Sequence, residues 1–159
     1  MIEIQIKSRD DMATIAQNPF LYKTALISIT DYGWNFAELK NKPEYMLQMI
    51  FDDIDADVFE DECGKEPTES ERRKIETKYH MMTDEQAKQI AEFYAEIKDK
   101  VDVLICQCEH GQSRSAGIAA AIMEYQNKNG IEIFASDKYY PNKIIFRKVL
   151  RQLQKDERN

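Results

Sequence analysis

A strand-to-helix unit near the middle of the chain most constrains how it can fold. The apolar run Val101–Cys106 has the length and composition of a buried strand, and Ser115–Tyr125, rich in alanine and isoleucine, is typical of a helix. Cys108 therefore lies in the turn between them. Strands and helices alternate elsewhere in the chain as well, which predicts an α/β fold.

The remaining elements follow from periodicity and caps. Thr83 and Gln86 form a capping-box pattern at the start of an amphipathic helix that leads into the central strand. Further strands are expected at 2–6, 25–29 and 45–51, and further helices at about 9–15 and 142–153. The turn-like residues Asp31-Tyr32-Gly33 end the second strand.

A polar insert at about 56–82 separates the third strand from the capped helix. It is acidic at first and then basic, with Thr68 and Glu71 as a capping pair. Two interpretations remain open: a solvated surface helix, or a lid that recognises substrate.

Length and charge restrict the class of protein. A chain of 159 residues with 43% hydrophobic residues suits one domain over 1–159. The net charge of -7 argues against binding to nucleic acid. An odd count of 3 cysteines argues against a disulfide framework, and neither a membrane span nor a signal peptide is recognisable, so we expect a cytoplasmic monomer that does not bind membranes.

The loop from Cys108 to Ser115 carries the clearest chemical signal. Successive backbone N–H groups at such a turn, together with the N-terminus of the following helix, can hold an oxyanion. Gly111 permits close approach of the backbone to a ligand, and Arg114 supplies a planar two-point fork. The same groups favour the thiolate of Cys108, the form in which a cysteine is a nucleophile.

These residues resemble the active-site loop of the cysteine-dependent protein tyrosine and dual-specificity phosphatases, in which a cysteine and an arginine are separated by five residues. Within this family, the chain most resembles the small bacterial or phage-like type. The resemblance extends to an aspartate after an upstream strand and to the pair Pro141-Asn142, and it implies a central, mostly parallel sheet flanked by helices. By the same resemblance, Asn142 braces the phosphate loop.

The resemblance implies a phosphomonoester hydrolase that acts through a cysteinyl-phosphate intermediate, with a phosphorylated protein or peptide as substrate. Phosphotyrosine is the expected target, with phosphoserine and phosphothreonine as further ones. Cys108 would be the nucleophile, Arg114 would bind the phosphoryl group, and Ser115 would stabilise the departing thiolate. The substrate-binding loop comprises Glu109, His110, Gly111, Gln112, Ser113 and Arg114. Neither a cofactor nor a metal is required.

The general acid is expected among the acidic residues that follow the third strand. Asp53 falls where the family's aspartate would fall, and it is the residue that we select. Asp55 is a rival, and Asp52 and Asp57 remain open.

Two features of the sequence bear on the rate of turnover and on the class of substrate. Gln107 stands where the family usually has a histidine, so the thiolate depends more on the loop and Arg114, which predicts slower turnover. The loop lacks lysine, and by the same resemblance this disfavours a lipid substrate, because relatives that act on phosphoinositides tend to carry basic residues there. The alternatives are a noncatalytic phosphate-binding module of the same fold and, less favoured, a sulfurtransferase or arsenate reductase.

Overall fold

The computed structural model describes residues 1–158, with side chains described as far as 155. Its strands are β1 (Glu3–Lys7), β2 (Thr24–Thr30), β3 (Tyr45–Ile50) and β4 (Val103–Gln107). Its helices are α1 (Arg9–Ile15), α2 (Ala56–Cys63), α3 (Glu69–Lys78), α4 (Asp84–Ile97), α5 (Arg114–Asn127), α6 (Ile131–Ala135) and α7 (Lys143–Arg158).

The four strands in the described part of the chain form one parallel sheet in the order β1-β4-β2-β3. This confirms the predicted α/β fold. Every residue of β2 and of β4 is buried, as expected for inner strands of a parallel sheet that is covered on both faces. The edge strand β3 is partly exposed.

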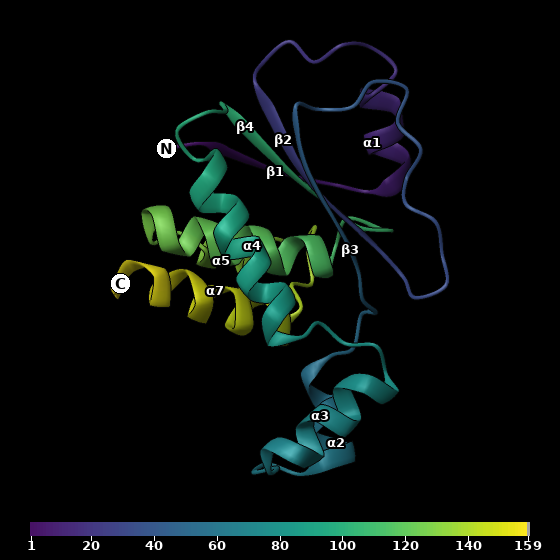
Figure 1. Ribbon diagram of the computed structural model, residues 1–159, viewed down its shortest axis with the longest axis vertical. Coiled ribbons are helices and arrows are strands. Elements are labelled where there is room, and N and C mark those ends of the chain that lie inside the picture. The colour runs from purple at the N-terminus through teal and green to yellow at the C-terminus, as the bar shows by residue number, and fades with distance from the viewer. Residues whose placement is uncertain (159) are drawn as a thin grey trace.

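Helices cover both faces of the sheet (Figure 1). On one face, Leu104 and Cys106 of β4 point into the larger core, where α4, α5 and α7 pack. On the other, Val103 and Ile105 pack against Met12 of α1. This alternation is the period of two that a strand imposes on its side chains.

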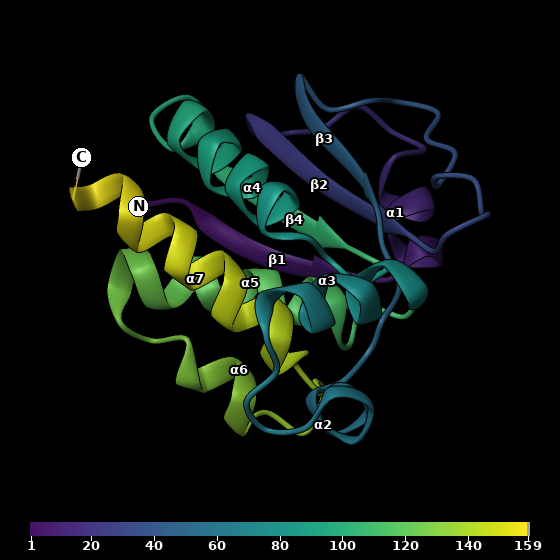
Figure 2. The same ribbon diagram turned by 60° about the horizontal axis from the view of Figure 1, so that its bottom comes forward.

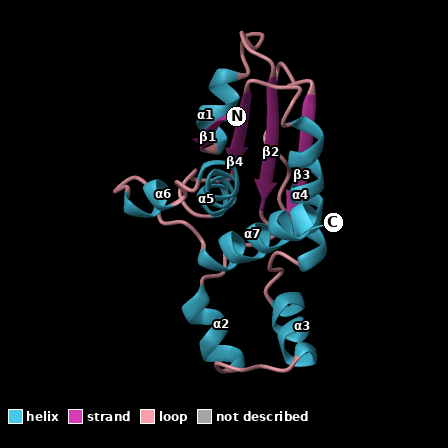
Figure 3. Cartoon of the chain, turned by 90° about the vertical axis from the view of Figure 1, so that its left-hand side faces the viewer, coloured by secondary structure: helices cyan, strands magenta, loops and turns pink. Residues whose placement is uncertain are grey.

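The polar insert forms two helices that project from the body of the protein. Figure 3 shows α2 and α3 at the end of the molecule toward which the arrowheads of the strands point. Neither helix has a buried residue. The predicted capping pair is present, because Thr68 accepts a hydrogen bond from the backbone N–H of Glu71 at 3.2 Å.

The capped helix begins where the sequence predicts. Thr83 and Gln86 make both hydrogen bonds of the capping box. The Gln86 side chain also donates to the carbonyl of Ile50 at 3.0 Å, which joins the start of α4 to the end of β3. The short helix α6 was not expected from the sequence, and it has no side-chain cap.

Candidate active site

Cys108 lies directly after β4, at the carboxyl edge of the sheet and before α5. Its side chain is only 2% exposed, and its sulfur lies 3.0 Å from the hydroxyl oxygen of Ser115 in the first turn of α5. Ligands bind preferentially at this edge of a parallel sheet, and the N-terminus of a helix favours negative charge. The local fold thus surrounds the sulfur with groups that stabilise an anion.

The backbone of the loop leaves its N–H groups available. Three loop carbonyls accept hydrogen bonds from surrounding backbone N–H groups: Glu109 from Arg9 at 3.1 Å, Gln112 from Tyr140 at 2.8 Å, and Ser113 from Asn142 at 3.1 Å. Within the described residues, no backbone N–H of 109–113 donates to the protein. Consecutive free N–H groups of this kind form a concave anion-binding nest.

Gly111 lets the loop pack tightly onto the junction of β1 and α1. Its φ is +68°, in the left-handed region, and a Cβ atom there would lie 2.6 Å from the backbone nitrogen of Ser8. A larger residue would therefore be strained by its backbone conformation and would also collide with the neighbouring chain.

Arg114 is held at one nitrogen and has a free one. Its Nη1 donates to the carboxylate of Asp31, which directly follows β2, and to the carbonyl of Phe51 at 2.9 Å. Its Nε is buried and has no hydrogen-bond partner among the described residues. An unpartnered buried donor is costly, so this nitrogen is available to an acceptor that the described residues do not supply, such as a bound anion.

Asp53 lies beside the loop. One oxygen of its carboxylate accepts a hydrogen bond from the Ser113 hydroxyl at 2.8 Å and another from the Asn142 side chain, also at 2.8 Å. Asn142 donates in addition to the carbonyl of Ile54 at 2.9 Å. Asn142 therefore links the start of α7 to the segment that carries Asp53 and, through its backbone, to the loop.

The rival carboxylates occupy structural positions. Asp55 is the N-cap of α2 and accepts from the backbone N–H of Val58 at 2.9 Å. Asp52 accepts from the backbone N–H of Tyr32 at 2.8 Å. Asp57 lies in the first turn of α2. Of the acids considered from the sequence, Asp53 is the one that contacts the Cys108 loop.

The other predicted loop residues differ in where their side chains lie. Glu109 forms an ion pair with Arg9 at 3.6 Å, on the α1 side of the loop. The side chains of His110 and Gln112 are exposed and make no hydrogen bond or ion pair with another described residue. An anion in the nest would therefore meet these three residues mainly through their backbone.

Gln107 and Cys106 are buried residues at the end of β4, directly before the loop. Gln107 is 1% exposed; its side chain accepts from the Ser28 hydroxyl at 2.5 Å and donates to the carbonyl of Cys108 at 3.1 Å. The amide thus fixes the backbone at Cys108 without adding charge. Burial raises the pKa of the Cys106 thiol, and the neighbouring Cys108 raises it further, so Cys106 remains an uncharged core residue.

Asp31 is the site residue that sequence reasoning missed. Its context, Asp31-Tyr32-Gly33, is that of an ordinary turn, and its partner Arg114 is 83 positions away in the chain. One signal was available: Asp31 directly follows a fully buried strand, and the carboxyl ends of parallel strands meet at one edge.

Within residues 1–155, whose side chains the structure describes, no group of three or more His, Cys, Asp or Glu residues could hold a metal ion. Among the described helices, none combines the length and apolar character needed to cross a membrane.

Comparison with known proteins gives structural neighbours only. No family model and no curated protein sequence matches this chain. Three solved structures share its architecture over nearly the whole chain. They are Tk-PTP in its active form, PTPMT1, and a mouse protein described as a dual specificity phosphatase complexed with zinc tungstate.

The likeness is one of fold. Tk-PTP has a TM-score of 0.51 at 15% identity, over 98% of this chain and 93% of its own. PTPMT1 has a TM-score of 0.53 at 12% identity, over 99% and 96%. The mouse protein has 0.51 at 13%, over 98% and 84%. The fold expected from the resemblance, that of protein tyrosine and dual-specificity phosphatases, is thereby confirmed.

Proposed function

We propose that this chain hydrolyses phosphomonoesters with Cys108 as the nucleophile. The observation that carries the proposal is the arrangement around its sulfur. The segment from Cys108 to Arg114 brings together the free backbone N–H groups of 109–113, the start of α5 and the unpartnered Nε of Arg114. These donors match the equatorial oxygens of a phosphoryl group, and they stabilise the charge of the transition state.

In the first step, the Cys108 thiolate attacks phosphorus in line, and the bond from phosphorus to the ester oxygen breaks. Asp53, protonated in this step, gives its proton to the leaving oxygen, and a cysteinyl-phosphate remains. Ser113 and Asn142 position the acid, since both donate to one of its oxygens at 2.8 Å.

In the second step, water attacks the cysteinyl-phosphate. Asp53, now a carboxylate, accepts a proton from this water, and the bond from phosphorus to sulfur breaks. The Ser115 hydroxyl, 3.0 Å from the sulfur, donates a hydrogen bond to the departing thiolate. Phosphate leaves with the free enzyme restored, and neither step requires a metal or a cofactor.

Phosphotyrosine in a protein or peptide is the substrate that we propose, with phosphoserine and phosphothreonine as further ones. One structural neighbour, PTPMT1, was solved in complex with PI(5)P, which makes a phosphoinositide the competing substrate class. The loop of this chain contains no lysine for a polyanionic headgroup, which favours the peptide.

A noncatalytic phosphate-binding module is the second candidate, because the uncharged Gln107 precedes the nucleophile. Turnover of p-nitrophenyl phosphate, with orthovanadate as a competitor, separates the two. We expect turnover that vanadate inhibits; vanadate binding without turnover would favour the module. Assays with thiosulfate and with arsenate test the sulfurtransferase and reductase alternatives.

The Cys108→Ser variant tests the nucleophile directly. We expect turnover to fall below detection, because a serine hydroxyl is not ionised near neutral pH, while affinity for a phosphotyrosyl peptide remains. Cys63→Ser is the matched control, since Cys63 belongs to α2 and lies outside the loop. Full activity of Cys108→Ser would remove this residue from the mechanism.

A further inference from the structure

A cleft of about 200 Å³ separates the insert from α7. One wall comes from α2, α3 and the turn between them, and the other from Ile144, Arg147, Lys148 and Arg151 of α7. These four positions share one face of a helix. Figure 2 shows α2 and α3 beside the first half of α7. We call this hollow the cationic cleft, because its lining includes Lys65, Arg72, Arg147, Lys148 and Arg151.

Most of the positive charge in the cationic cleft is not neutralised. Lys148 is buried and paired: its Nζ lies 2.5 Å from Glu76 and donates to the carbonyl of Met82 at 2.7 Å, which holds α3 against α7. The other four cations form no ion pair with any described residue. Glu60 is the one further carboxylate in the lining, apart from Glu76.

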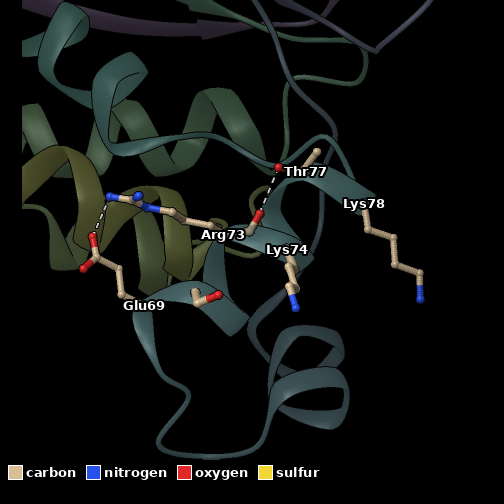
Figure 4. Close-up of a pocket in the computed structure, with 6 residues that line it drawn as sticks. Glu69, Arg73, Lys74, Thr77 and Lys78 are labelled. Atoms are coloured by element: carbon tan, nitrogen blue, oxygen red, sulfur yellow. Dashed lines mark hydrogen bonds and ion pairs between the residues drawn. The ribbon is translucent and has the colours of Figure 1, made fainter.

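Such a concentration is unusual for a chain with a net charge of -7. Elsewhere on the insert, Arg73 and Lys78 each form an ion pair with a glutamate. Figure 4 shows a hollow on α3 alone, where Arg73 reaches back to Glu69 at 2.6 Å. Like charges that line one cleft repel one another and raise the local concentration of an anionic ligand. The cationic cleft therefore suits a partner with negative charge.

The cationic cleft adjoins the Cys108 loop. Ala56 in its lining is two residues beyond Ile54, whose carbonyl accepts from Asn142 at 2.9 Å. Ile144, also in the lining, is two residues beyond Asn142. Two residues of chain span at most roughly 7 Å. The segments that hold Asp53 beside the loop thus lead directly into the walls of the cleft.

We propose that the cationic cleft binds acidic side chains of the substrate protein, two to four residues from the phosphorylated one. An extended peptide spans roughly 7–14 Å over that interval. A peptide whose phosphorylated residue lies in the Cys108 loop could therefore reach the adjoining cationic cleft with these acidic side chains. Arginine forks bind carboxylates at two points. This inference rests on the proposed function, because it places the phosphorylated residue in the Cys108 loop.

A peptide fits the cleft better than a membrane surface does. The cations line both walls of a recess that single side chains can enter. Besides Glu60 of the lining, the wall formed by α2 carries the acidic residues Asp57, Asp61 and Glu62. A flat anionic bilayer that approached the cleft would meet these carboxylates and be repelled, whereas an acidic peptide segment can lie along the recess.

Two phosphotyrosyl peptides test the proposal, one with three glutamates and one with three alanines at positions two to four from the phosphotyrosine. For the wild type, we expect kcat/KM to be about tenfold higher for the glutamate peptide at low salt, with the preference shrinking at high salt. The double variant Arg147→Glu/Arg151→Glu should lose this preference and keep its turnover of p-nitrophenyl phosphate.

The matched control is Lys23→Glu/Lys98→Glu. It changes the charge equally at exposed residues that precede β2 and follow α4, at the opposite end of the sheet, and it should keep the preference. Equal kcat/KM for the two peptides in the wild type, or a preference that survives in Arg147→Glu/Arg151→Glu, would overturn the inference. A further test uses vesicles that contain a phosphoinositide. If the double variant lowered turnover of the phosphoinositide but not of the peptides, the inference would be overturned in favour of binding to a membrane.

A binding measurement separates this inference from the proposed function. Fluorescence anisotropy of the glutamate peptide without its phosphate reports on the cleft alone. We expect weak, salt-sensitive binding to the wild type that Arg147→Glu/Arg151→Glu abolishes. Absence of p-nitrophenyl phosphate turnover would refute the proposed function, whereas unchanged anisotropy in the double variant would refute the cleft.

Discussion

Arg114 shows how one side chain can be anchored and remain free to bind. Its Nη1 is fixed by Asp31 and by the carbonyl of Phe51, while its buried Nε has no partner in the described part of the protein. Arginine has five N–H donors in one plane, so holding one edge orients the other. Asp31 is therefore a positioning residue in our proposal, acting through Arg114.

The Asp31→Asn variant tests this role. Loss of the charge weakens the anchor, and we expect kcat/KM for p-nitrophenyl phosphate to fall about 10- to 100-fold, with weaker vanadate binding. Asp31→Glu should restore part of the loss, and Asp102→Asn, an exposed aspartate before β4, should have no effect. Tighter vanadate binding by Asp31→Asn would show instead that Asp31 competes with the anion for Arg114.

The choice of general acid can be tested with leaving groups. Asp53→Asn should lower kcat about 100-fold for alkyl or unsubstituted phenyl phosphates, whose leaving oxygens need a proton, and far less for p-nitrophenyl phosphate. Asp55→Asn is the matched control, because asparagine caps a helix as well as aspartate does and α2 should remain intact. If Asp55→Asn shows the leaving-group dependence, the assignment to Asp53 is wrong.

At the scale of elements, the insert is attached to the body of the protein at few points. The backbone N–H of Asp52 donates to the carbonyl of His80 at 2.8 Å, so the two ends of the insert already lie side by side. Lys148 provides the main further link through Glu76. Since α2 and α3 bury no residue, they contribute little to the core.

Replacing 56–78 with a short Gly-Ser linker should therefore leave a folded protein. We expect the Tm to change by only a few degrees and p-nitrophenyl phosphate turnover to stay within about threefold, since the loop and Asp53 remain. The preference for the acidic peptide should disappear with one wall of the cationic cleft. Loss of p-nitrophenyl phosphate turnover with an unchanged Tm would show that the insert supports the loop itself.

At the scale of the whole molecule, the prediction of a single domain remains to be tested. The larger core joins the sheet to α4, α5 and α7, and Leu104 at its centre is fully buried. A core shared by elements from both halves of the chain should unfold as one unit.

Leu104→Ala should lower the free energy of unfolding by about 3 kcal/mol, through lost burial and the cavity left behind. Leu21→Ala is the control, because Leu21 is 93% exposed and should change stability little. Urea unfolding followed by circular dichroism and by Trp34 fluorescence should give coincident transitions. Two separate transitions would contradict a single domain.

Much of the site could be predicted because its signals are local. Strand β4, the loop from Cys108 to Arg114 and helix α5 follow one another in the chain. The capping box of Thr83 and Gln86 is recognisable from four consecutive residues. Hydrophobic periodicity likewise predicted the helices that cover the sheet. Two boundaries differ slightly from the prediction. Helix α5 begins at Arg114, one residue earlier than expected. Strand β4 begins at Val103 and not at Val101, because the backbone N–H of Val101 still donates to the carbonyl of Ile97 at the end of α4.

The sequence by itself determined the α/β class and the spacing of Cys108 and Arg114, because hydrophobic pattern and turn chemistry act between near neighbours. Only the tertiary structure decided that Asp53 faces the loop while Asp55 caps α2, since adjacent acids look alike in sequence. It also decided that Asp31 anchors Arg114 and that the insert meets α7. The contacts of Asp53 with the loop and of Asp31 with Arg114 join residues that are far apart in the chain. The parallel pairing of the strands brings these residues together, because it places the carboxyl ends of the strands at one edge of the sheet.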